Sequence, residues 1–87
     1  MKLQRFIEQI VQDNSGGMEM TEVHVHIISA LQHAKISDFK YSRAKNWGTK
    51  LQDAVYQAII ESRKLEILEY TWRDGQQLRA KQFVYTP

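Results

Sequence analysis

Hydrophobic side chains recur at helical spacing over the first part of the chain. The positions that carry them are Leu3, Phe6, Ile7, Ile10 and Val11. This i, i+3, i+4, i+7, i+8 pattern places them on one face of an amphipathic helix. The run Asn14-Ser15-Gly16-Gly17 then favours a helix end, because Asn and Gly tolerate the left-handed conformation that follows a last turn. The pattern predicts a helix over about residues 2–13.

The following segment alternates like a strand at first, over Val23-His24-Val25-His26-Ile27. Placing its residues at the 100° interval of a helix resolves the ambiguity, because most apolar side chains then fall on one arc. That arc holds Met20, Val23, Ile27, Ile28, Ala30, Leu31 and Ala34, and the opposite side holds Glu22, His26, Ser29 and His33. We predict a helix over about 21–35 with Thr21 as its N-cap, and Met18-Glu19-Met20 as a short strand before it.

A further amphipathic helix is predicted over about residues 49–63. Thr49-Lys50-Leu51-Gln52 has the form of a capping box, in which Thr49 caps the helix and Gln52 reaches back to it. The face toward the core holds Leu51, Ala54, Val55, Ala58, Ile59, Ser62 and Leu65, whereas Gln52, Asp53, Tyr56, Gln57, Ile60 and Lys64 point away. Residues 36–48, just before it, have no clean period. They form either a short helix anchored by aromatic residues or an ordered loop.

The last part of the chain changes from helical to strand periodicity. Leu65 to Trp72 and Leu78 to Tyr85 are rich in β-branched, aliphatic and aromatic residues. They flank Asp74-Gly75, which is a strong signal for a β-hairpin. The order of elements is therefore two helices, an irregular stretch, a third helix and a hairpin.

The loop length of this hairpin decides which side chains face the core. A two-residue loop would mix charged residues into the face that carries Leu68 and Tyr70, so we predict a three-residue loop over residues 73–75. This register pairs Tyr70 with Leu78 and Leu68 with Ala80, and it sets Glu69 opposite Arg79. It predicts that Leu68, Tyr70 and Leu78 face the core together.

Composition limits the class of protein further. The chain has 87 residues, of which 43% are hydrophobic and 25% charged, which is typical of one globular domain. It contains no cysteine, so disulfides, thiolate zinc sites and thiol nucleophiles are excluded. No apolar run approaches the ~20 residues of a membrane span, and the first residues do not form a signal peptide. We expect a single cytoplasmic domain that does not associate with membranes.

Catalytic and metal-binding patterns are weak. Gly16-Gly17 lacks the context of a nucleotide-binding loop, no serine elbow occurs, and no two carboxylates are placed to share a proton. We therefore expect neither an enzyme nor a cofactor. Glu22, His26 and His33 share a helical face, but the two histidines lie about 10 Å apart along the axis, too far for one metal ion. We interpret them as a solvated face, and His24 as a half-buried, hydrogen-bonded residue.

Positive charge is concentrated in the centre of the chain. Residues 35–50 hold five cations and one anion, a balance of +4 against a net charge of +2 for the whole chain. Aromatic residues are interleaved with these cations. Cations neutralise phosphates and aromatic rings stack on bases, so the stretch predicts an anionic partner such as nucleic acid. The alternative interpretation is a solvated loop whose aromatic residues belong to the core.

In its order of elements the chain resembles the winged helix-turn-helix superfamily, which implies an α+β domain with three main helices and a C-terminal hairpin as the wing. In this resemblance residues 49–63 form the recognition helix. It implies duplex DNA binding, with base-facing positions at Lys50, Gln52, Asp53, Tyr56 and Gln57. It implies backbone contacts from Arg43, Lys45, Asn46 and Thr49, and a wing contact from Arg73. Lys40 of the basic stretch completes the predicted nucleic-acid-binding site. Residues 36–48 are longer than the tight turn that the superfamily has between its second and third helices.

Two functions remain from the sequence. The first is a small DNA-binding transcriptional regulator of prokaryotic or phage type, acting as a homodimer. The second is a protein-interaction module on the same scaffold, in which Tyr56 and Ile60 dock a partner. Winged helices serve both purposes, so the fold alone does not separate them.

Overall fold

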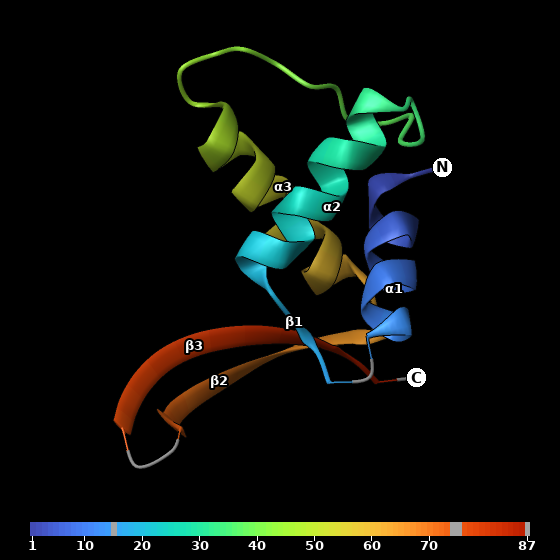
Figure 1. Ribbon diagram of the computed structural model, residues 1–87. Helices are drawn as coiled ribbons and strands as arrows, with labels where there is room; N and C mark the ends of the chain where they lie inside the picture. The colour runs from blue at the N-terminus through green and yellow to red at the C-terminus, as the bar shows by residue number, and fades with distance from the viewer. Residues whose placement is uncertain (15, 74–75, 87) are drawn as a thin grey trace.

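The computed structural model describes residues 1–14, 16–73 and 76–86, and between residues 69 and 80 it describes the backbone alone. The elements in chain order are α1 (Leu3–Asp13), β1 (Met18–Glu19), α2 (Met20–Gln32), α3 (Trp47–Glu61), β2 (Leu65–Arg73) and β3 (Gln76–Tyr85). The three helices pack together above the sheet (Figure 1). The predicted α+β class is confirmed, and the three helices with a small antiparallel sheet are compatible with a winged-helix-like layout. None of the described helices combines the length and apolar character of a membrane span.

The core lies where the three helices meet the sheet. Its fully buried side chains come from every helix and from the paired strands β1 and β3. They are Ile7, Val11, Met18, Val23, Ile27, Leu51, Val55 and Phe83. Each helix contributes residues that its periodicity had assigned to the inner face. Burial of apolar surface therefore fixes the rotation of the helices, as the hydrophobic pattern indicated.

The sheet has the strand order β1-β3-β2, and both pairings are antiparallel. Met18 of β1 pairs with Phe83 of β3, so the predicted short strand closes onto the last strand of the domain. Gly17, just before β1, has φ +88, and a Cβ there would lie 3.0 Å from the Val84 side chain. Only glycine fits this combination of positive φ and close approach. Gly17 therefore allows the chain to turn into β1 directly beside β3.

Helix α2 differs from its prediction at both ends. Thr21 is not its N-cap, because the helix begins at Met20 directly after the paired residue Glu19, which forms no side-chain cap hydrogen bond. At the other end, the Lys35 N–H donates to the Ala30 carbonyl and the Ala34 N–H to the Leu31 carbonyl. These two bonds form a Schellman motif.

Ala34 occupies the left-handed position of this motif, with φ 54. The prediction that Ala34 belongs to the apolar arc was wrong, since its side chain is exposed. Helical periodicity does not apply to a residue that lies beyond the last turn.

Helix α3 begins two residues earlier than predicted. Its first residue is Trp47 and its N-cap residue is Asn46, so Thr49 lies inside the first turn and the predicted capping box does not form. Trp47 packs against the core, and this packing outweighs the low helix propensity of Gly48 in the first turn. Residues 35–46 contain no helix, which settles the alternatives for this stretch in favour of a loop.

The predicted hairpin register was wrong. Tyr70 pairs with Ala80 and Leu68 with Gln82, while Arg73 and Gln76 form the pair next to residues 74–75. The register changes between Tyr70 and Trp72, where two residues of β3 oppose one residue of β2. Because of this bulge, the residue pairs near the end of the hairpin are in a different register from the pairs between Leu65 and Tyr70.

The new register changes the face of β2 that meets the core. Ile67 pairs with the buried Phe83 and Leu65 with Tyr85, and all four side chains pack in the core or against it. Leu68, predicted to face the core, is exposed. The predictions for Tyr70 and Leu78, and for Glu69 beside Arg79, concern side chains outside the described set.

Candidate nucleic-acid interface

The loop between α2 and α3 is fixed at its start. Ile36 is buried, and the Ser37 N–H donates to the Met1 carbonyl at 2.8 Å. The Asp38 carboxylate accepts a hydrogen bond from the Leu3 N–H at 2.7 Å. Helix α1 has no capping side chain of its own, so Asp38 caps it from 35 residues away. This role was not predicted, because no local pattern relates the two positions.

The same loop is fixed at its end by two aromatic rings. Trp47 is half-buried and packs against the core, and the Tyr41 ring lies 4.9 Å from it, tilted by 53°. The Ala44 N–H donates to the Ser42 hydroxyl, and the Trp47 N–H donates to the Ala44 carbonyl. Residues 40–46, here called the basic loop, therefore follow a defined course between two anchored ends.

The basic loop and the first turn of α3 present their polar side chains to solvent. The exposed residues of the predicted site here are Lys40, Arg43, Lys45, Asn46, Thr49 and Lys50. No aspartate or glutamate occurs between residues 39 and 52. Within the described part of the chain, the four cationic side chains make no salt bridge. The structure thus exposes all four cations in one continuous segment, the basic loop and the first turn of α3.

The start of α3 adds partial positive charge to this region. Its first turn contains no acidic residue, and Asn46 contributes no side-chain cap hydrogen bond. The free N–H groups of a first turn carry the positive end of the helix dipole, which favours an anion nearby. Lys50 lies in the same turn, where a cation is unfavourable unless negative charge is supplied from outside.

The exposed face of α3 has a mixed character. Helical geometry places Thr49, Asp53 and Ile60 within about 40° of one another at its centre. Asp53 is exposed and Ile60 is 72% exposed. Gln52 is exposed on one flank of this face, so its amide is presented to solvent. Lys50 and Gln57 lie on the other flank.

Tyr56 does not point away from the protein as predicted. It is half-buried, and its ring packs edge-on against Phe83 with centroids 6.1 Å apart and an interplanar angle of 87°. The Lys81 Nζ lies 5.5 Å from the Tyr56 ring centroid. Helical geometry alone places Tyr56 on the outer face, within about 20° of Thr49, so its contact with β3 could not be anticipated from the sequence pattern.

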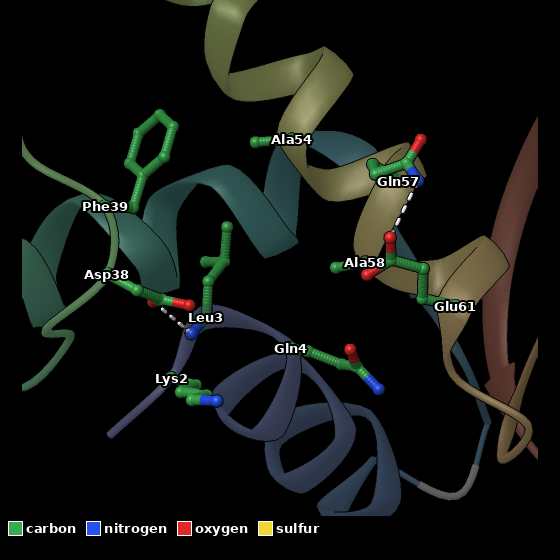
Figure 2. Close-up of a pocket in the computed structure, with 9 residues that line it drawn as sticks. All are labelled: Lys2, Leu3, Gln4, Asp38, Phe39, Ala54, Gln57, Ala58 and Glu61. Carbon is green, nitrogen blue, oxygen red and sulfur yellow. Dashed lines mark hydrogen bonds between the residues drawn. The ribbon is translucent and has the colours of Figure 1, made fainter.

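A shallow groove of about 340 Å³ lies on the opposite flank of α3, between that helix, the start of α1 and residues 38–39 (Figure 2). Leu3, Phe39 and Ala54 form apolar parts of its lining. At its edge the Gln57 amide donates to the Glu61 carboxylate at 2.9 Å. Gln57 is therefore engaged within its own helix, in contrast to Gln52.

Arg73, the predicted wing contact, is the last residue of β2. Its backbone pairs with Gln76 beside the end of the hairpin, and its side chain lies outside the described set. In Figure 1 the hairpin extends far from the helices, on the left of the view, where the first turn of α3 also lies. Both chain ends lie on the right.

The histidine side chains in and directly after α2 do not form a metal-binding cluster among the described residues. His26 is exposed, and the exposed His33 ring donates to the Ser29 carbonyl of its own helix at 2.8 Å. Among the described residues no group of three or more His, Asp or Glu side chains could hold a metal ion. His24 is half-buried as predicted, but its Nε2 atom is buried without a hydrogen-bond partner in the described part of the chain. Burial lowers the pKa of His24.

Comparison with known proteins adds no relative to this description. No family model matches the chain, no curated protein is similar to it, and no solved structure is similar to it.

Proposed function

We propose that the protein binds duplex DNA through the basic loop, the first turn and exposed face of α3, and the hairpin. The observation that carries this proposal is the set of four exposed cations, Lys40, Arg43, Lys45 and Lys50, in a segment without any acidic residue. Within the described part of the chain they have no anionic partner. Phosphates supply such a partner and release counterions when they are neutralised.

The layout of the fold supports a duplex as the ligand. The first turn of α3 and the outer part of the hairpin lie on the same side of Figure 1, with both chain ends on the opposite side. A duplex along that side would meet the helix with one groove and the hairpin with its adjacent backbone. A cytoplasmic transcriptional regulator that acts as a homodimer is the role that goes with this arrangement.

The proposed contacts are of two kinds: contacts to phosphates position the duplex, and contacts to base edges read its sequence. Lys40, Arg43, Lys45 and Lys50 offer contacts to phosphates, which carry no sequence information. Gln52 is the base-reading candidate, because its amide is exposed and a glutamine amide makes a bidentate contact with adenine. Asp53 can accept a hydrogen bond from the amino group of cytosine, although it is repelled by phosphate.

A titration with fluorescent duplex at several ionic strengths tests the proposal. Four phosphate contacts give a log–log slope of affinity against salt of about −3 to −4, at about −0.9 per contact. Replacing Arg43 and Lys45 together by alanine should flatten the slope by about two units on every sequence. Gln52→Ala should change the sequence preference and leave the slope nearly unchanged.

The matched control is the double replacement of Arg63 and Lys64 by alanine. Both residues are exposed and follow the other end of α3, so the same charge is removed roughly 20 Å away from the first turn. This variant should keep the wild-type slope. Equal flattening by both double variants would mean that only net charge matters. Absence of binding to any duplex at low ionic strength would refute the proposal.

One observation favours a second function, a protein-interaction module. Ile60 is 72% exposed at the centre of the outer face of α3, which is a place for a partner rather than for a phosphate. The packing of Tyr56 against Phe83 leaves Ile60 as the main apolar contact of such a surface. Under this alternative, Ile60→Asp abolishes partner binding, and the Arg43/Lys45 variant retains it.

A further inference from the structure

Tyr41 is unusual among the Phe, Tyr and Trp side chains that the structure describes, because its ring is exposed. Its side chain is 54% exposed, whereas the other described Phe, Tyr and Trp rings are buried or half-buried. It lies in the basic loop, and its ring contacts Trp47 at 4.9 Å. Trp47 is the first residue of α3 and packs against the core. One side of the Tyr41 ring is therefore supported by a fixed ring, and much of the remainder is open to solvent.

The surroundings of this ring carry positive charge. Lys40 precedes Tyr41 directly, and Arg43 and Lys45 follow within the same loop, all with exposed side chains. Aromatic rings flanked by cations are the general means by which proteins hold unpaired nucleotides, because each base offers a π-face and each phosphate a negative charge. In a closed duplex the base faces are covered by their stacked neighbours, so such a ring has nothing to stack on.

We propose that Tyr41, supported by Trp47, is a stacking platform for one unpaired base of a nucleic acid whose backbone is held by the basic loop. This inference rests on the proposed nucleic-acid binding and adds a preference to it. The preferred ligand is a duplex with an unpaired nucleotide, at an overhang or at a bulge. The loop cations bind the backbone beside the unpaired base, and the tyrosine ring covers its face.

The test compares three fluorescent DNA probes of one sequence. They are a blunt duplex of about 14 base pairs, the same duplex with a single-stranded overhang, and the same duplex with a one-nucleotide bulge. Stacking of one base predicts about 5- to 140-fold tighter binding of an unpaired-base probe than of the blunt duplex. Comparison of the overhang probe with the bulge probe shows whether the protein prefers an unpaired base at the end of a duplex or inside it. An overhang made of RNA shows whether the sugar matters.

Substitutions at Tyr41 separate stacking from simple coverage of Trp47. Tyr41→Phe keeps the ring and should keep most of the preference. Tyr41→Leu keeps an apolar cover for Trp47 but has no π-face, so the ratio of overhang to blunt affinity should fall to about one. The matched control Val25→Ala removes an exposed apolar side chain on α2 and should keep the full ratio. Circular dichroism and a thermal melt of each variant verify the fold.

A direct signal comes from Trp47. With Trp72 replaced by phenylalanine, Trp47 is the sole tryptophan of the chain, and its emission should change more on binding the overhang probe than on binding the blunt duplex. Equal affinity for all three probes in the wild type, or an unchanged ratio in Tyr41→Leu, would overturn the platform while leaving duplex binding intact. Absence of binding to every probe would instead refute nucleic-acid binding itself, and the platform with it.

Discussion

Val23 and Val25 are two residues apart on α2 and have opposite environments. Val23 is fully buried in the core, and Val25 is 67% exposed. Replacing Val23 by alanine should lower the free energy of unfolding by about 2 kcal/mol, because the buried methyl groups are lost and a cavity remains. The same replacement at Val25 should change it by less than about 0.5 kcal/mol. Urea denaturation of both variants checks this, and equal losses would mean that α2 is rotated differently.

His24 should make the stability of the protein depend on pH. Burial lowers its pKa in the folded state, whereas in the unfolded chain the pKa keeps its ordinary value of about 6.5. As pH falls below that value, the unfolded chain binds the proton first, so stability falls until the pH passes the folded-state pKa. Above about pH 6.5 this contribution is fully present.

Urea denaturation at about pH 7.5 and pH 5.5 measures this effect. The stability difference between the two pH values should be smaller in His24→Gln than in the wild type. His26→Gln, which changes an exposed residue on the same helix, should keep the wild-type difference. An equal decrease in both variants would contradict a specific role of the burial of His24.

The end of α2 contains an avoidable strain. Ala34 adopts φ 54 in the Schellman motif, a conformation that costs a residue with a Cβ roughly 1 kcal/mol and glycine very little. Ala34→Gly should therefore raise the free energy of unfolding by about 0.5–1 kcal/mol. Ala44→Gly, at another exposed alanine whose φ is not positive, should lower it instead. A thermal melt distinguishes the two signs, and destabilisation by Ala34→Gly would contradict the assigned motif.

The helices could be predicted from the sequence because each has one apolar face, and burial of that face determines its rotation. The helix ends could not, because packing decides them: Trp47 extends α3 beyond Thr49, and strand pairing of Glu19 fixes the start of α2. The hairpin register failed for a related reason. Both faces of β2 carry apolar residues, Ile67 on one and Leu68 on the other, so alternation alone does not select the inner face.

The candidate site was predictable to the extent that it is local in sequence. The cations of the basic loop lie close together along the chain, so composition was sufficient to find them. Tyr56 was assigned to the outer face because helical periodicity places it there, and its contact with Phe83 of a distant strand accounts for its half-burial. Asp38 at the start of α1 is likewise a tertiary feature, which no window of neighbouring residues contains.

At the scale of the whole molecule, the dimensions predict the length of duplex that one copy would contact under the proposed DNA binding. The longest principal extent is 41 Å, because the hairpin projects beyond the helices. At 3.4 Å per base pair, one copy covers about 12 base pairs. Affinity should therefore rise with duplex length up to about 12–14 base pairs and then level off for one copy.

Titration of duplexes of about 8, 12, 16 and 24 base pairs measures the footprint. A homodimer would instead need two half-sites about one helical turn apart, so its affinity should keep rising up to the longest duplex. Sedimentation of the complexes gives the stoichiometry that separates the two cases. Full affinity for the 8-base-pair duplex would show that the hairpin takes no part in binding.

The pairing of Met18 with Phe83 has a consequence for the synthesis of the protein on the ribosome. The largest fully buried side chain belongs to the last strand, so the helices are made before the residue that completes their core exists. At a translation rate of about 5–20 residues per second, their apolar faces stay uncovered for several seconds. We expect ribosome-bound chains that stop before Phe83 to be open to proteases and chaperones. Resistance of the nascent chain to proteolysis should appear only once β3 has left the exit tunnel.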